Sequence, residues 1–465
     1  MDINSSEMLR ILRASMQNVD DELTDVPLQV QGELPPALDG LLFRNGPGRF
    51  ERGGVPYAHP FDGDGHIVRL DIGSTGVRFS NRFVRSAEFV AEERAGRMLY
   101  RNFGTNLPGG LIANLFRLRF KNAANTSIVW HAGRLLALWE GGLPHRLDPR
   151  TLATLGVEDF QGRLRNRAAP PLRWLAPTLP FSAHPRLDAA TGELFNFGVL
   201  FGSPNRLVIY RVDRDGRMAP PRMHDLPRFS FVHDFVVTAR WLCFLLPHAD
   251  FDVPRALLGL NTPVGSLRLA TARPMQALLI PRDGGRCVEM ETVPGFVFHI
   301  AQGFERDDGA LLMDVMRYRD YPGFEDLESL FDAPAPEAPS RLERLILEPH
   351  TGRCTMQSWS ARGAELPTTA PGPVGRERRF IYSIGAPADR GVPWFTALQR
   401  LDTRTGEMRV LDLCPDLPGE PVLAPAAGSE GWLLSLVNRA GGQPSQLLVL
   451  RASDLGIQAR VTLPF

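Results

Sequence analysis

Three histidines in this chain lie inside runs of residues that are typical of β-strands. They are His184 in FSAHPRLD, His233 in FSFVHDFVV and His299 in GFVFHIAQGF. An imidazole flanked by aromatic and β-branched residues is expected to point into a closed interior. Three such imidazoles without cysteine companions favour a nitrogen-ligated metal of intermediate softness, for which iron and zinc fit best. The alternative is that each one is a hydrogen-bonded histidine of the core.

The bulk composition excludes several classes of protein. The 465 residues are 43% hydrophobic and 9% aromatic, which is enough to bury a large core. The 52 basic residues balance the 52 acidic ones, so no overall charge attracts nucleic acid. The four cysteines are scattered without a C-x-x-C pair, which fits a reducing cytoplasm. The N-terminus lacks the long apolar segment of a signal peptide, and no apolar run reaches the roughly 18 residues of a membrane span.

Similar turn motifs recur between short apolar runs. An acidic residue opens each turn, and in most of them a glycine supplies a positive φ before the return strand. The motifs begin at Leu147, Leu187, Val212, Leu347 and Leu401. Hairpins repeated in this way predict an all-β repeat fold, and a β-propeller is the best solution because radial closure removes most edge strands. A pair of β-sandwich domains is the alternative, but no linker separates two halves, so we expect one domain over residues 1–465.

Some segments break the hairpin pattern. Residues Ser6–Met16 carry an apolar stripe that predicts a helix, within an N-terminal leader of residues 1–33. Residues Leu107–Phe120 and Val253–Leu279 are apolar without alternation. In a propeller they are expected to rise above one face, where they can roof a cavity or touch a membrane surface; ordinary loop packing is the alternative. The proline-rich stretch 331–344 is expected to be an exposed loop between blades.

Two glycine-rich motifs near the N-terminus, RNGPG at residues 44–48 and FDGDGHI at residues 61–67, resemble those of the carotenoid cleavage oxygenases. Taken alone, the second motif predicts only a fixed, tight turn. Further matches follow in the family's order, in LWEGG, SAHPRLD, FVHDFVV, FVFHIAQGFE, AELPTTAP and GEPVLAP. The resemblance runs from about Leu34 to the last residue. It implies a seven-bladed β-propeller with loop and helix excursions forming a dome over one face.

The resemblance also implies a site. His184, His233 and His299 match three of the four histidines that bind Fe(2+) in this family. Glutamates that hold the histidine ligands in this family are matched by Glu140, Glu365 and Glu420. Such a carboxylate accepts the N–H that a metal-bound imidazole turns outward, which fixes the tautomer and raises the basicity of the ligand.

The chain departs from the family pattern in two places. The family's fourth histidine follows a segment that resembles ARVTLPF, and the printed chain stops at Phe465. A shortened sequence, a three-histidine site and loss of the metal are the open interpretations, and we expect the C-terminal blade to be incomplete. The final strand is expected to close the ring by pairing with the N-terminal strands. Gln302-Gly303 stands where relatives usually have Asn-Ala, which is expected to alter packing or the shape of the cavity.

The function that the resemblance implies is cleavage of a conjugated C=C bond in a carotenoid or apocarotenoid by O2, giving carbonyl products. An apolar polyene substrate predicts a tunnel with aromatic walls and peripheral contact with a membrane. The tunnel candidates are Phe103, Phe116, Trp139, Phe235, Phe298 and Phe304. Three alternatives stay open. They are a stilbene-cleaving relative, which would have a lysine near Glu140, a metal-free propeller that binds partners, and a zinc hydrolase.

Overall fold

All five predicted turns form hairpins in the computed structural model, which describes residues 5–117, 119–168, 176–319, 340–386, 395–426 and 430–465. The turns join β10 (His145–Leu147) to β11 (Thr154–Val157), β12 (Arg186–Asp188) to β13 (Glu193–Leu200), β14 (Arg206–Val212) to β15 (Arg222–Asp225), β24 (Ser340–Glu348) to β25 (Arg353–Thr369), and β27 (Ala397–Asp402) to β28 (Met408–Asp412). In the second hairpin the Asp188 carboxylate accepts a hydrogen bond from the Ala190 amide, and Gly192 has a φ of 73°. The acidic residue and the left-handed glycine close the turn as the pattern predicts.

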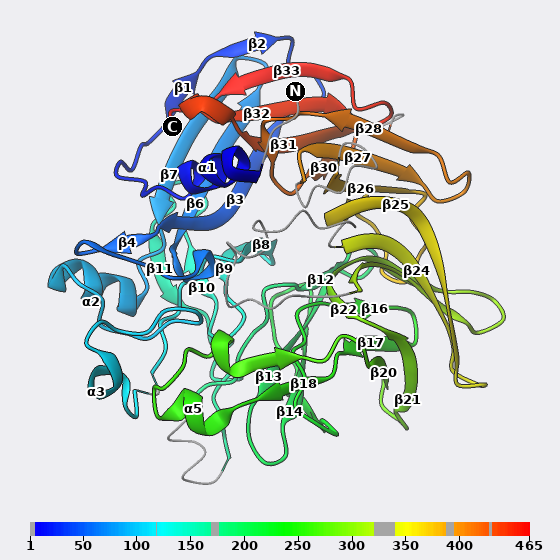
Figure 1. The fold of residues 1–465 in the computed structure, drawn as a ribbon. Helices are drawn as coiled ribbons and strands as arrows, with labels where there is room; N and C mark the ends of the chain where they lie inside the picture. The colour runs from blue at the N-terminus through cyan, green and yellow to red at the C-terminus, as the bar shows by residue number, and fades with distance from the viewer. Residues whose placement is uncertain (1–4, 118, 169–175, 320–339, 387–394, 427–429) are drawn as a thin grey trace.

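The hairpins assemble into seven blades around a central axis, which confirms the predicted propeller (Figure 1). Four blades are separate four-stranded sheets, and two share one sheet because the 17-residue β25 crosses from one blade to the next. The other blade strands are β3 (Gly40–Arg49), β6 (Asp64–Gly73), β7 (Gly76–Phe83) and β1 (Val26–Leu28) in blade one; β8 (Ser127–His131) and β9 (Arg134–Leu138) in blade two; β16 (Phe235–Val237), β17 (Trp241–Leu246), β20 (Pro274–Pro281) and β21 (Val288–Pro294) in blade four; β22 (Phe296–Glu305) and β23 (Leu311–Tyr318) in blade five; β26 (Phe380–Gly385) in blade six; and β29 (Leu417–Pro418), β30 (Val422–Ala424), β31 (Trp432–Asn438), β32 (Gln446–Arg451) and β33 (Ile457–Thr462) in blade seven.

The ring closes by pairing the two ends of the chain. Strand β2 (Val30–Gly32) lies antiparallel to β33, with Val30 opposite Val461. This is the predicted closure. The described sheet of the last blade contains β30 to β33 and gains β2 as a further outer strand, and the expected incompleteness of this blade stays a prediction. The N-terminal segment therefore covers an edge of the last blade that would otherwise expose unpaired backbone groups.

The hydrophobic core is divided among the interfaces between neighbouring blades. Blades four and five, for example, bury Met275, Leu279 and Val315 between them, and blades seven and one bury Leu70 and Leu447. Comparable clusters lie at the other interfaces. Because each blade packs on both of its neighbours, the inner strands are fixed relative to one another around the axis.

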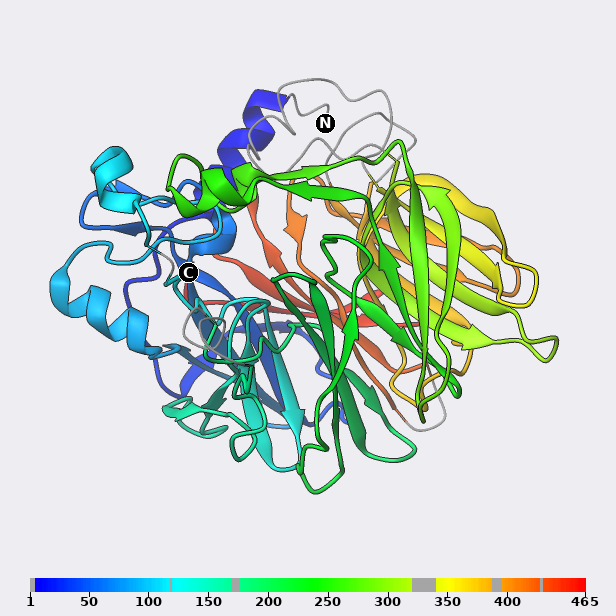
Figure 2. The ribbon, with the colours of Figure 1, turned by 90° about the horizontal axis from the view of Figure 1, so that it is seen from below.

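The expected excursions gather over one face of the propeller (Figure 2). Helices α1 (Ser5–Ser15), α3 (Gly110–Asn114) and α5 (Val253–Leu257), the η2 turn (Val264–Ser266) and the hairpin of β18 (Ala249–Phe251) and β19 (Leu267–Leu269) form this dome, with α2 (Ala87–Ala95) beside it. The buried guanidinium of Arg101 joins the dome segments by donating to the carbonyls of Ala256 and Asn261. One predicted boundary is wrong, because the second excursion ends before β20, whose alternating residues belong to blade four. Of the predicted loop 331–344, residues 331–339 lie outside the described residues and the rest begins β24.

The acidic turn near the N-terminus is a fixed loop, as predicted. It spans the η1 turn (Pro60–Asp62) and the start of β6, beside the small hairpin of β4 (Glu51–Arg52) and β5 (Val55–Pro56). The buried Asp62 accepts hydrogen bonds from the amide of Gly104 and the hydroxyl of Thr105. A Cβ atom on Gly65 would lie 2.2 Å from the carbonyl oxygen of Ala124, so no larger residue fits there. The η3 turn (Ala440–Gly442) contacts α1 on the dome side.

Candidate metal centre

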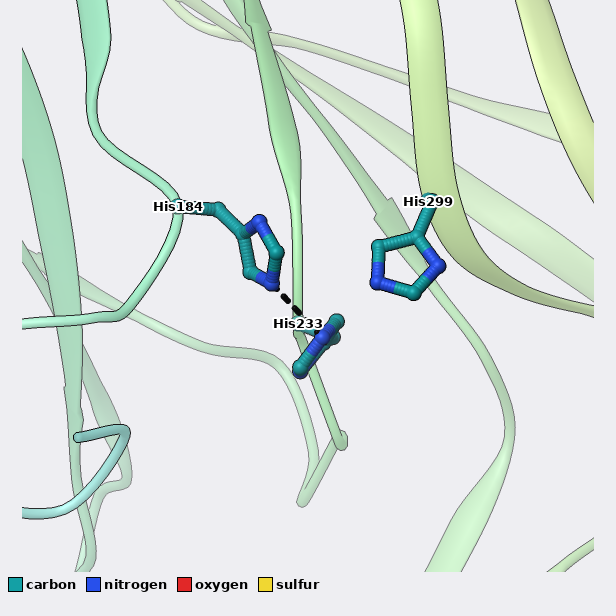
Figure 3. Close-up of side chains that lie close together, drawn as sticks. All are labelled: His184, His233 and His299. Carbon is teal, nitrogen blue, oxygen red and sulfur yellow. Dashed lines mark hydrogen bonds between the residues drawn. The ribbon is translucent and has the colours of Figure 1, made fainter. Parts of the chain in front are cut away.

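The three histidines singled out from the sequence converge in the structure (Figure 3). One ligand nitrogen from each of His184, His233 and His299 lies within 4.8 Å of the other two. Nε2 of His184 is 2.8 Å from Nε2 of His233, and the ring centroid of His299 lies 5.1 Å from each of the other centroids. Three imidazoles that are far apart in the chain therefore share one small volume.

Three successive blades supply these side chains. His184 and His233 lie two residues before β12 and β16, and His299 lies within β22. Each of these strands forms one edge of its sheet. The pairing of β22 with β23 slips on both sides of Ile300, which marks an irregularity next to His299. Such bulges re-aim the neighbouring side chains, and they are common beside active sites.

Two of the three predicted glutamates lie behind the histidines. Oε2 of Glu365 is 2.6 Å from Nδ1 of His299, in hydrogen-bond geometry, and Glu365 is buried. Oε1 of Glu140 is 3.2 Å from Nδ1 of His233, which is an ion-pair distance without hydrogen-bond geometry. Both carboxylates therefore face the nitrogen that points away from the cluster.

The third glutamate has a different setting. The nearest cation to Glu420 is Arg44, whose Nη1 atom lies 3.4 Å from the Glu420 carboxylate. The Glu420 side chain is 47% exposed, and it lines a cavity that His184 and His299 also reach. Among the described residues no histidine forms a hydrogen bond or ion pair with Glu420.

The electrostatic environments of the imidazoles differ. Burial lowers the pKa of His184 well below its ordinary value, and the neighbouring His233 and His299 lower it further. Burial also acts to lower the pKa of His299, but the charge and hydrogen bond of Glu365 outweigh burial and raise that pKa to about 9. His184 is therefore neutral, with a lone pair available as a ligand, whereas His299 is held ready to donate its Nδ1 proton to Glu365.

The donor set fits a metal ion. Two Nε2 atoms 2.8 Å apart either share a proton or direct both lone pairs at a common cation. The carboxylates beside Nδ1 of His233 and His299 favour the tautomer in which Nδ1 carries the proton and Nε2 is the ligand atom. A cluster of imidazole nitrogens without thiolates suits iron, cobalt or zinc.

A polar cavity of about 260 Å³ adjoins the cluster. Strand β25 contributes Pro367, Thr368 and Thr369 to the cavity wall. The lining residues are His184, Arg186, Asp234, His299, Ile300, Ala301, Pro367, Thr368, Thr369 and Glu420.

Gln302 is not among the residues that line this cavity. Its amide instead donates to Asp314 and to the carbonyl of Arg378, so the unusual residue affects packing between blades five and six.

The predicted tunnel aromatics fall into two groups. Phe298 lies edge-on to His233 with 5.2 Å between ring centroids, and Phe103 packs in the same cluster as Phe298. Trp139 adjoins Glu140 and covers Gly141 and Gly142. The others lie in different surroundings: Phe116 is 68% exposed on the dome, Phe235 is buried against Phe197 and Phe244, and Phe304 packs near the Arg344 guanidinium.

Several aromatic residues that sequence reasoning missed lie between the dome and the histidines. Phe231 stacks on His233 with 6.5 Å between centroids, and Phe296 contacts Phe298. Phe229 belongs to the same cluster and stacks on Phe201, which is 58% exposed. The signal was present in FSFVHDF, where aromatic residues alternate directly before the histidine. An aromatic series therefore connects the surface of the dome with the metal-site candidates.

Comparisons with known proteins agree with this geometry. A family model described as retinal pigment epithelial membrane protein matches residues 16–465. The chain is 35% identical over 451 residues to an apocarotenoid-15,15'-oxygenase from Synechocystis sp., covering 93% of this chain and 89% of that protein. It is 29% identical to resveratrol cleavage oxygenase 1 from Aspergillus fumigatus, covering 94% and 89% of the two chains. A structure of cobalt-substituted Synechocystis apocarotenoid oxygenase superposes with a TM-score of 0.89 at 33% identity, covering 99% and 96%.

Proposed function

The chain belongs to the family of the retinal pigment epithelial membrane protein, which includes apocarotenoid and carotenoid cleavage oxygenases, and we propose that it is an iron(II) dioxygenase of apocarotenoids. The proposed reaction splits one conjugated C=C bond with one O2 molecule to give two carbonyl groups, so that no further oxidant is needed. The observation that carries this proposal is the convergence of His184, His233 and His299 from three blades, with carboxylates behind two of them.

In this proposal the three histidines hold the iron, and iron supplies the redox chemistry that lets O2 react with an alkene. Glu365 holds the ring of His299 through the Nδ1 hydrogen bond, and Glu140, at ion-pair distance from Nδ1 of His233, favours the tautomer that leaves Nε2 available. The protein residues contribute no general acid or base to the reaction. Their tasks are to orient the ligands and to surround the reacting bond with apolar side chains.

The aromatic series from Phe201 to Phe298 is the proposed path of the substrate. Its rings provide an apolar wall from the exposed surface of the dome to His233. The exposed apolar surface of the dome supports peripheral contact with the membrane that dissolves such a substrate. Its exposed members on α3, on α5 and next to them are Leu111, Ile112, Leu115, Phe116, Phe201, Val253, Leu257, Leu258 and Leu260. No helix among the described residues is long and apolar enough to cross a bilayer.

A specific observation favours a polyene over a hydroxystilbene. The only lysine of the chain, Lys121, is fully buried, and its ammonium group donates to Tyr57 and Glu92 and pairs with Asp64. It is therefore not available to meet a phenolic hydroxyl group. At the position directly before Glu140, the side chain is Trp139, which is larger and apolar.

The experiment that tests the proposed reaction is incubation of the iron-loaded protein with an apocarotenal and, separately, with a hydroxystilbene under ¹⁸O2. We expect cleavage of the apocarotenal with labelled oxygen in both carbonyl products. Cleavage of the stilbene alone would contradict the choice of substrate. Label in only one product, after correction for exchange with water, would indicate a monooxygenase. Purified protein that binds no iron and cleaves neither substrate would contradict the assignment as an enzyme.

The membrane contact needs its own test. We expect the Ile112→Glu/Phe116→Glu double variant to co-sediment less with liposomes than the unchanged chain, because both side chains are strongly exposed on the dome. Val157→Glu is the matched control, since Val157 is 59% exposed on the outer strand of blade two. Equal binding by all three proteins would contradict contact through α3.

A further inference from the structure

Blades three, four and five are joined next to the histidines by one arginine and one aspartate. Arg186, two residues after His184, donates through Nη2 to both carboxylate oxygens of Asp234 at 2.6 Å. Asp234 directly follows His233. The Asp234 side chain is 3% exposed and the Arg186 side chain 28%, so this is a partly buried ion pair between two of the three segments that carry histidines.

The same two side chains also hold the segment of the third histidine. Nη2 of Arg186 donates to the carbonyl of Ile300 at 2.8 Å, and Oδ2 of Asp234 accepts from the Ile300 amide at 2.8 Å. Ile300 directly follows His299 at the point where the pairing of β22 with β23 slips. Both polar groups of one backbone unit next to His299 are thus held by side chains from the two preceding blades.

The pair makes a third set of contacts, with Phe235 on blade four. Nε of Arg186 donates to the carbonyl of Phe235 at 3.0 Å, and Oδ1 of Asp234 accepts from the Phe235 amide at 2.7 Å. Phe235 and Ile300 lie on β16 and β22, which form edges of their sheets. Unpaired backbone groups on such edges are costly when buried, and here the arginine and the aspartate satisfy them.

We propose that Arg186 and Asp234 act as a clamp that fixes the mutual spacing of His184, His233 and His299 and thereby sets the affinity of the metal site. They are positioning residues, because neither side chain touches the metal ligands directly. Each reaches the backbone within two residues of a ligand. The hydrogen bonds of the clamp run between blades, whereas Glu140 and Glu365 orient single rings. The inference rests on the proposed function only in assuming that a metal binds the three histidines.

The test compares Co(II) affinity with stability in three variants of the clamp. Asp234→Asn and Arg186→Gln remove the charge and part of the hydrogen bonds, and we expect about a 10-fold to 100-fold weaker affinity, as for other partners that orient metal ligands. Arg186→Lys keeps the charge near Asp234 but loses the planar fork that reaches two carbonyls at once. Its Co(II) affinity is therefore expected to lie between that of the unchanged chain and that of Arg186→Gln. It also serves as the folded variant if Arg186→Gln does not fold. Affinity is measured by competition with a chromogenic chelator, together with the visible spectrum of bound Co(II).

Arg379→Gln is the matched control. Arg379 forms a comparable bidentate pair with the buried Asp402 in blade six, away from the histidines. We expect this variant to lose thermal stability while its Co(II) affinity and spectrum stay unchanged. If the clamp variants bind Co(II) with the affinity and spectrum of the unchanged chain, the clamp is refuted and the metal site stands. If the unchanged chain binds no Co(II), the metal site and the clamp are both refuted.

Discussion

The contact between Glu365 and His299 yields the most demanding prediction. The carboxylate lies 2.6 Å from Nδ1 and is buried, so the hydrogen bond is charge-assisted. Hydrogen bonds to charged groups contribute about 1.5–3 kcal/mol, which corresponds to about 10-fold to 150-fold in an equilibrium constant. Glu365→Gln keeps the shape of the side chain and removes its charge. At a pH where protons no longer compete with the metal for His299, the variant is expected to bind Co(II) more weakly than the unchanged chain by about this factor.

Proton competition makes the effect depend on pH. Glu365 raises the pKa of His299 to about 9 in the absence of metal, so a metal must displace a proton at neutral pH. Below the pKa, the Co(II) affinity of the unchanged chain is expected to rise about tenfold for each pH unit. The variant lacks the charge that raises this pKa, so its affinity is expected to change less between pH 7 and pH 8.5. The two proteins should therefore differ most at the higher pH.

The assay is chelator competition at pH 7, 7.75 and 8.5, with Glu305→Gln as control. Glu305 lies at the end of β22, the strand that carries His299. Its carboxylate accepts hydrogen bonds from the Thr238 hydroxyl at 2.6 Å and from the Arg240 amide at 2.8 Å. Its replacement is expected to lower stability and to leave both the affinity and its pH dependence unchanged. Parallel pH profiles for Glu365→Gln and the unchanged chain would refute the role assigned to Glu365. So would an equal loss of affinity in the control.

Three predictions concern stability. Burial lowers the pKa of His66 to about 4, and its Nε2 lies 2.9 Å from the side-chain amide of Asn81. Neutral His66 therefore contributes up to about 3 kcal/mol to the free energy of unfolding above pH 6.5, and this contribution is lost as the pH falls toward 4. Urea titrations should show that His66→Gln loses less stability than the unchanged chain over that pH range. Gly32→Val should lower the unfolding temperature measured by calorimetry, because Gly32 has a φ of 91° and its Cβ would lie 2.3 Å from the backbone of β33. Gly73→Val is the control: a Cβ at this position meets open space, so the unfolding temperature should change little. Lys121→Met should cost about 3–5 kcal/mol of unfolding free energy, because the two buried carboxylates of Asp64 and Glu92 are then left with Arg52 as the one cation that they share, and a loss under 1 kcal/mol would contradict this.

The repeated hairpins could be predicted from sequence because each turn is a local event. An acidic cap and a left-handed glycine act within a few residues, and all five turns form as expected. The order of the blades follows from the same regularity. The boundary of the second excursion was not predicted, because Met275 and Leu279 are apolar in a loop and in a buried strand alike.

The sequence indicated the three histidines that converge in the structure, and it was less informative about the residues around them. Phe235 is two residues from His233, and period-two alternation would place both side chains on one face. The regular strand begins only at Phe235, however, so the alternation does not extend back to the histidine. Phe304 is five residues from His299, an odd separation that period-two alternation assigns to opposite faces, and a slip in strand pairing also lies between them. The contacts of Arg186 with Asp234 and Ile300 join three blades, and no local pattern encodes them.

The Gln302-Gly303 departure shows how a change beside the site can leave the cavity intact. A Cβ on Gly303 would lie 2.2 Å from Cγ1 of Val236 on the neighbouring blade, so the glycine and the branched valine fit each other across the interface. The Gln302 amide is held at both ends, because its nitrogen donates to Asp314 and its oxygen accepts from the Arg378 amide. Both residues therefore fix blade five against its neighbours. The cavity wall is formed instead by Ile300 and the residue after it, on the part of β22 that Arg186 and Asp234 hold. The packing of blade five against its neighbours and the spacing of the histidines are thus maintained by separate contacts.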